Sequence, residues 1–95
     1  MTKKITASQN VFETLGFNPS EAENLRLRAE MMIALRRYIE KENLTQQEAA
    51  SLFSVSQPRM SDLVRGKIGK FTIDMLVTML AASGTHVKLT LKKAA

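Results

Sequence analysis

The stretch Leu44–Gly66, LTQQEAASLFSVSQPRMSDLVRG, holds the signals for two short helices joined by a tight turn. Thr45 can cap the first helix, and Glu48 three residues later can reach back to complete a capping box. Ser54 and Val55 form the turn, since a new helix start follows them at once. The residues expected to face the core from the first helix are Ala49, Leu52 and Phe53.

The second helix of this stretch has its own start and stop. Ser56 can cap it, and Pro58 stands in its first turn, where a missing N–H costs nothing. Gly66 ends it. The inward stripe is Met60, Leu63 and Val64, and the outward positions are Gln57, Arg59, Ser61, Asp62 and Arg65. Two short helices with a tight turn, the second polar on its outer face, predict a DNA-binding helix-turn-helix.

Composition limits the alternatives. With 95 residues, the chain is expected to form one domain. It has no cysteine, so disulfides and thiolate metal sites are excluded, and His86 has no companions at ligand spacing. We therefore expect no cofactor, no metal and no enzyme activity. No apolar run reaches the roughly 20 residues that span a bilayer, and the N-terminus lacks a signal-peptide pattern, which predicts a cytoplasmic protein without a membrane partner.

The positive charge is unevenly placed. The net charge is +5, yet residues 20–43 balance five bases with five acids. From residue 44 to 70 the bases outnumber the acids; the bases are Arg59, Arg65, Lys67 and Lys70, and the acids are Glu48 and Asp62. A basic surplus that begins at the second helix is the pattern expected of a phosphate-binding face.

The elements before this stretch are a flexible N-terminus (residues 1–9), a short helix and a long helix. The short helix, within residues 10–17, is capped by Asn10 and stopped by Gly16. Ser20 and Glu23 form a capping box that predicts a helix to about Glu42. Its core stripe is expected to be Leu25, Ala29, Met32, Ile33, Arg36 and Ile39, with Leu35 adjoining.

After Gly66 a loop with Lys67 and Lys70 leads to a last helix, which Thr72 can cap and which runs through Ser83. Its expected core stripe is Ile73, Leu76, Val77 and Leu80, flanked by Met75 and Met79. The period then changes to two: Val87, Leu89 and Leu91 alternate with Lys88, Thr90 and Lys92. This pattern predicts a strand over residues 85–92.

A lone strand has unpaired edges, and no second strong strand exists in the sequence. We therefore expect the strand to pair with its own copy in a homodimer or with a partner's sheet, the homodimer being preferred. The fold class is all-α, with about five helices and one C-terminal β-strand. Residues 10–95 form a single domain in which Val87, Leu89 and Leu91 provide the dimerisation contacts.

The chain resembles the lambda-repressor-like helix-turn-helix family of the Cro/xenobiotic-response-element class. The matching positions are Leu44-Thr45-Gln46, Ala49-Ala50, Val55-Ser56-Gln57, Ser61 and Arg65-Gly66. The wider frame, from Asn10 to Leu91 and anchored by SQPRMSDLVRGK and KFTIDML, looks like the HigA-type antitoxin subgroup. One departure is Ser54, which stands where this class usually has glycine.

The resemblance implies that the second helix of the motif enters the major groove. Its base-reading residues would be Gln57, Pro58, Arg59, Ser61 and Asp62. Gln57 suits adenine, Arg59 suits guanine, and Pro58 can offer an apolar contact. Asp62 would accept from cytosine or pair with Arg59. Phosphate contacts would come from Gln46, Arg65, Lys67 and Lys70, although Arg65 could instead pair with Asp62.

The resulting hypothesis is a DNA-binding repressor that binds a palindromic operator in double-stranded DNA as a homodimer. The resemblance adds the antitoxin of a type II toxin–antitoxin operon, with a HigB/RelE-like toxin as partner and autoregulation of its promoter. One alternative is a prophage or stand-alone repressor without a toxin. An alternative of another class is a protein-interaction module that neutralises a partner without binding DNA.

Overall fold

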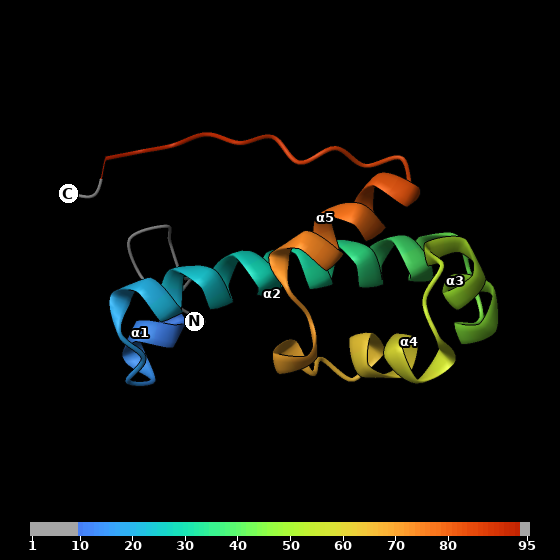
Figure 1. Cartoon of the computed structure of the whole chain (residues 1–95), viewed down its shortest axis with the longest axis horizontal. Coiled ribbons are helices and arrows are strands. Elements are labelled where there is room, and N and C mark those ends of the chain that lie inside the picture. Colours follow the sequence, from blue (N-terminus) through green and yellow to red (C-terminus); the bar gives the residue numbers. More distant parts are fainter. Residues whose placement is uncertain (1–9, 94–95) are drawn as a thin grey trace, which may run out of the picture.

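The structure, a computed structural model, describes residues 10–93 of the chain, so the predicted flexible segment 1–9 lies outside it. Within the described range there are five α-helices and one 3₁₀ helix, and no strand is present (Figure 1). Their bounds are α1 Val11–Thr14, α2 Pro19–Lys41, α3 Gln46–Phe53, α4 Gln57–Val64, η1 Ile68–Lys70 and α5 Ile73–Ala82. The predicted all-α class with about five helices is confirmed for this part of the chain.

The long helix α2 is the element around which the others assemble. It contacts α1, α4, η1 and α5, whereas α3 packs against α4 and α5. In Figure 1, α5 lies along one side of α2 and α4 lies on the other. The long helix α2 therefore supports the pair α3 and α4, directly through α4 and through α5 on the side of α3.

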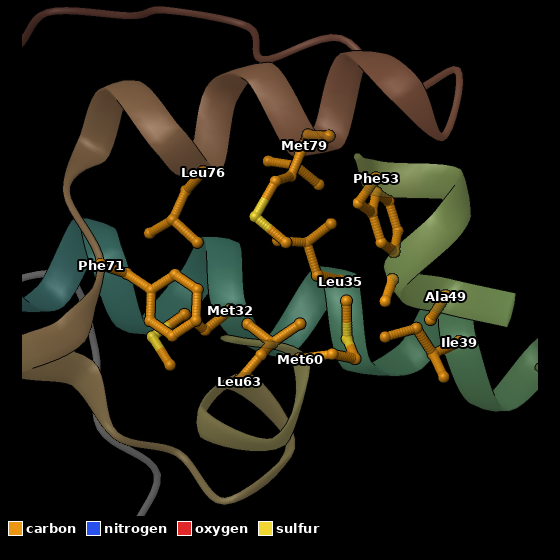
Figure 2. Packing of buried hydrophobic residues seen from close by; sticks show 12 residues of the cluster. Met32, Leu35, Ile39, Ala49, Phe53, Met60, Leu63, Phe71, Leu76 and Met79 are labelled. Carbon is orange, nitrogen blue, oxygen red and sulfur yellow. The ribbon is translucent and has the colours of Figure 1, made fainter. Parts of the chain in front are cut away.

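One hydrophobic core joins all the helices except α1. Figure 2 shows side chains from α2, α3, α4 and α5 meeting in one cluster, with Phe71 from the segment before α5. Phe71, Leu35, Met60, Leu63 and Leu76 are its largest fully buried side chains. The Tyr38 and Phe53 rings, 6.3 Å apart, extend the cluster along α2 in an edge-on arrangement. The helix α4 is fixed to this core through Met60 and Leu63.

Four predicted core positions are wrong, and one of them is Arg36 of α2, which is exposed. Ile33 is 46% exposed while Leu35 is fully buried, because α2 turns the stripe of Met32, Leu35 and Ile39 toward its neighbours. In α5, Val77 is 40% exposed and Met79 is buried. In α3, Leu52 is 39% exposed and Ala50 takes the inward place. Periodicity allows two adjacent stripes on one helix, and the packing partner selects between them.

The start of α2 also differs from prediction. The predicted capping box of Ser20 and Glu23 is wrong, since Asn18 is the N-cap and Pro19 is the first helical residue. The Oδ1 atom of Asn18 accepts from the backbone N–H of Glu21 at 2.9 Å. Proline suits this first position because its fixed φ is helical and no N–H is needed there. Glu23 instead pairs with Arg26 at 2.7 Å, which lowers the pKa of the Glu23 carboxyl through a hydrogen bond.

The C-terminal segment leaves α5 at Ser83 and Gly84 and runs back toward the α1 end of the molecule (Figure 1). Residues 85–93 have neither helix nor strand in the single chain. Val87, Leu89 and Leu91 are 48%, 79% and 84% exposed. The predicted strand thus finds no partner within residues 10–93, and the three apolar side chains remain uncovered.

Candidate nucleic-acid interface

The first helix of the motif begins with the predicted capping box. The Oγ1 atom of Thr45 accepts from the backbone N–H of Glu48 at 3.0 Å, and the Glu48 carboxylate accepts from the backbone N–H of Thr45 at 2.8 Å. This reciprocal pair satisfies two N–H groups that a helix start leaves without partners. The other backbone N–H groups of the first turn lie at the same end of α3 as Gln46, which is the exposed first residue of this helix.

The turn between α3 and α4 is closed by a left-handed residue. Ser54 has φ 56° and ψ 44°, and its backbone N–H donates to the carbonyl oxygen of Ser51 at 3.2 Å. The Val55 N–H donates to the carbonyl oxygen of Ala50 at 3.0 Å. A non-glycine residue in this region costs roughly 1–2 kcal/mol. Serine thus adopts the left-handed conformation at the position where the resembled class usually has glycine, and the turn still joins α3 to α4.

The second helix of the motif, α4, is anchored by its apolar side and open on its polar side. The Oγ atom of Ser56 accepts from the backbone N–H of Arg59 at 3.2 Å, as predicted for its cap. Pro58 stands in the first turn. Gln57 and Pro58 are exposed at the N-terminal end, whereas Arg59, Ser61 and Asp62 are half-buried. The end of α4 that would read bases is thus accessible.

Arg59 does not project freely. Its Nη1 atom donates to the carbonyl oxygen of Lys70 at 2.6 Å, and its guanidinium lies over the Phe71 ring, 5.7 Å from the centroid. This arrangement joins α4 to the loop that follows it, and it was not predicted. Because Phe71 is buried at 1% exposure, the ring is a fixed platform for the guanidinium.

Asp62 also has a different partner from those predicted. Its carboxylate lies 3.8 Å from the Nζ atom of Lys67, rather than on Arg59 or Arg65. The Lys67 backbone N–H donates to the Asp62 carbonyl oxygen at 2.9 Å, which places the two residues side by side. Gly66, between them in the chain, makes the turn possible with φ 72°. The ion pair is partly exposed and weak, so Lys67 can exchange it for another anion.

The predicted phosphate-binding residues lie on elements that contact one another. Lys67 and Lys70 are exposed in the segment of residues 67–71, called the η1 loop below. Arg65 is exposed at the C-terminal end of α4. Since η1 packs against α4 and α4 packs against α3, the structure gathers these cations and Gln46 around the helix-turn-helix.

Arg28 is a residue that sequence reasoning missed. Its Nη1 atom donates to the carbonyl oxygens of Ile68, at 3.1 Å, and Phe71, at 3.2 Å. The sequence placed Arg28 in the charge-balanced face of α2, and nothing in local spacing links it to a loop 40 residues away. Only the tertiary arrangement reveals the contact.

Other kinds of site find no support in residues 10–93. No group of three or more histidine, cysteine, aspartate or glutamate side chains gathers there in a way that could hold a metal ion. In the same residues, no helix has the length and apolar character needed to cross a membrane. His86 is exposed just after α5.

The fold and the α3–turn–α4 geometry define a helix-turn-helix protein. The model of the family described as "Helix-turn-helix domain" matches residues 12–92, and the chain belongs to this family. A solved structure provisionally named an XRE-family transcriptional regulator is similar, with a TM-score of 0.73 and 28% identity. The match covers 78% of this chain and 83% of that one. No curated protein matches the chain.

Proposed function

We propose that this protein is a DNA-binding transcriptional regulator that reads its operator with α4. The observation that carries the proposal is the exposed N-terminal end of α4 beside the cationic η1 loop. The helix-turn-helix family and the similarity to the XRE-family regulator support it. In such proteins the second helix of the motif lies in the major groove with its N-terminal residues toward the bases.

Gln57 is the leading base reader, since it is exposed at the first position of α4 and its amide suits adenine. Pro58 offers an apolar contact beside it, and Ser61 and Asp62 follow on the next turn. Arg59 can read guanine once its guanidinium leaves the Lys70 carbonyl. Gln46, Arg65, Lys67 and Lys70 bind phosphates on either side, which fixes the register of α4 on the duplex.

The functional unit in this proposal is a homodimer formed through residues 85–92. Val87, Leu89 and Leu91 alternate and are all exposed, so pairing with a second copy would cover one apolar face and complete the strand ladder. A two-fold dimer presents two α4 helices about one DNA turn, roughly 34 Å, apart. The operator would then be a palindrome.

At a finer level, we propose that the regulator is the antitoxin of a toxin–antitoxin operon and represses its own promoter. The resemblance of residues 10–91 to HigA-type antitoxins supports this choice, and the partner would be a HigB/RelE-like toxin. A stand-alone or prophage repressor shares every feature of α3 and α4. Co-purification from the native operon separates the two, since an antitoxin retains a basic partner protein and a stand-alone repressor does not.

The DNA-binding proposal is tested by fluorescence anisotropy with DNA from upstream of the protein's own gene and with a shuffled duplex. Wild type should prefer the upstream DNA, and Gln57→Ala should reduce that preference. Gln47→Ala is the matched control, because Gln47 is an exposed glutamine of α3 without an assigned contact. If wild type binds neither duplex while retaining a protein partner, the chain is a protein-interaction module and the proposal is wrong.

A further inference from the structure

Arginine side chains hold the η1 loop from two directions. Arg28 of α2 donates from Nη1 to the carbonyl oxygens of Ile68 and Phe71, at 3.1 and 3.2 Å. Arg59 of α4 donates to the intervening Lys70 carbonyl at 2.6 Å. Three carbonyl groups of a four-residue segment are therefore bonded to guanidinium groups, and the backbone that carries Lys70 is positioned by side chains from outside the loop.

Arg28 is itself oriented by a neighbour. Its Nε atom donates to the Oδ1 atom of Asn24, one helical turn earlier on α2, at 2.6 Å. A guanidinium group is planar with its donors in a rigid fork, so fixing Nε also fixes the direction of Nη1. On the other side of the contact, Phe71 is anchored in the core by its buried side chain. The link from α2 to the loop is thus held at both ends.

The two arginines differ in what DNA binding would do to them. Arg59 is on the proposed reading helix, and a bond to guanine would compete with its bond to Lys70. The carbonyl bonds of Arg28 do not compete with base reading, since Arg28 belongs to α2. Resting on the proposed function, we propose that Arg28 is a positioning residue for DNA binding: it holds the η1 loop so that Lys67 and Lys70 meet phosphates.

The physical reason is the cost of ordering the loop. A segment held in its binding geometry before DNA arrives avoids the conformational cost of fixing it on binding. Removing Arg28 would leave the Ile68 and Phe71 carbonyls without that donor and loosen the backbone between them. The lysines would keep their charges but lose their fixed positions, and the effect on affinity would pass through the loop.

A double-mutant cycle tests whether Arg28 affects DNA binding through the position of Lys70. Affinity for upstream DNA is measured for wild type, Arg28→Met, Lys70→Ala and the double variant. We expect Arg28→Met to weaken binding by up to about tenfold, because DNA binding would then have to order a segment that hydrogen bonds to a charged group, worth about that much, hold in the wild type. Lys70→Ala should cost less in the Arg28→Met background than in wild type, because its lysine is already misplaced. The matched control Arg37→Met removes one charge from an exposed site on α2 and should change affinity less than twofold or so.

A measurement on the free protein accompanies the cycle. Amide hydrogen exchange at Lys70 and Phe71, whose backbone N–H groups donate to the Lys67 and Ile68 carbonyls, should speed up in Arg28→Met and stay unchanged in Arg37→Met. If Arg28→Met does not fold, Arg28→Lys and Asn24→Ala serve in its place, with the same non-additivity and faster exchange expected. Additive effects of Arg28 and Lys70, or wild-type affinity in Arg28→Met, would overturn the inference. A wild type that binds no DNA refutes the proposed function instead, and unchanged loop exchange would then refute the loop-holding role separately.

Discussion

Arg59 of α4 donates from Nη1 to the backbone carbonyl of Lys70 at 2.6 Å, so the proposed reading helix and the proposed phosphate-binding loop are joined within one protomer. The contact is on the exposed side of the molecule, and the guanidinium also rests on Phe71. An arginine in this position can either stay on the loop or turn to a base. The two positions of the Arg59 side chain predict different effects of substitutions on DNA binding.

Arg59→Ala is expected to weaken binding to upstream DNA by about 1–3 kcal/mol and to relax discrimination at one base pair, because a bidentate guanine contact is lost. Arg59→Lys should restore part of the affinity but not the discrimination, since an ammonium lacks the planar fork. Affinities against a set of single base-pair substitutions measure both effects. If every base-pair preference survives in Arg59→Ala, the residue serves the loop and does not read DNA.

Asp62→Asn is expected to strengthen binding to random DNA by a few-fold and to steepen its salt dependence. The substitution removes a negative charge from the proposed binding face and frees Lys67, whose Nζ lies 3.8 Å from the Asp62 carboxylate. Glu13→Gln is the control, since it removes one negative charge from exposed α1, at the other end of α2 (Figure 1). Equal gains in the two variants would mean that only net charge matters.

Ser54→Gly is expected to stabilise the fold by about 0.5–1 kcal/mol, because relief of the left-handed strain exceeds the added entropy of the unfolded chain. Urea unfolding gives the free energy of unfolding. Asn43→Gly provides the comparison: its φ is 54°, close to the 56° of Ser54, but asparagine tolerates this region better, so its gain should be smaller. A loss of stability in Ser54→Gly would show that the serine is not strained.

Leu89→Lys is expected to dissociate the proposed homodimer without unfolding the protomer, since Leu89 is 79% exposed in the single chain. Thr90→Lys is the matched control on the opposite face of the alternating segment. Sedimentation velocity over a range of concentrations gives the mass of each. A monomeric wild type, or a Leu89→Lys variant with the dimer's mass, would contradict pairing through this segment.

Local signals predicted much of this fold, and the errors have two causes, tertiary packing and competition between local rules. The caps at Thr45, Ser56 and Thr72 depend on bonds within three residues, so spacing alone reveals them. The choice of Leu35 over Ile33 depends on which neighbours α2 meets, and no single helix contains that information. The cap of α2 moved from Ser20 to Asn18 because proline is a good first residue, a rule that competed with the capping box.

The sequence predicts which residues are exposed at the start of α4, but not the long-range hydrogen bonds around the candidate site. Residues at the start of α4 follow from the motif, because its helices and turn set their exposure. The contacts of Arg28 with Ile68 and Phe71 join residues 40 and 43 positions apart. Asn10 behaves likewise: it caps α1 as predicted, but its Nδ2 atom also donates to the Ala22 carbonyl at 2.9 Å. Such bonds depend on how the helices pack, so they cannot be predicted from the spacing of residues in the sequence.

The central claim is that α4 and the η1 loop form a DNA-reading surface. The most direct test of this claim is the salt dependence of binding to upstream DNA. Arg65, Lys67 and Lys70 supply three cations per protomer, or six per proposed dimer. The slope of log K against log salt should therefore be about −5 for the dimer. Lys67→Ala with Lys70→Ala should reduce its magnitude by roughly 3 to 4 units. A slope near zero in the wild type, or the same slope in the wild type and in the double lysine variant, would contradict the claim.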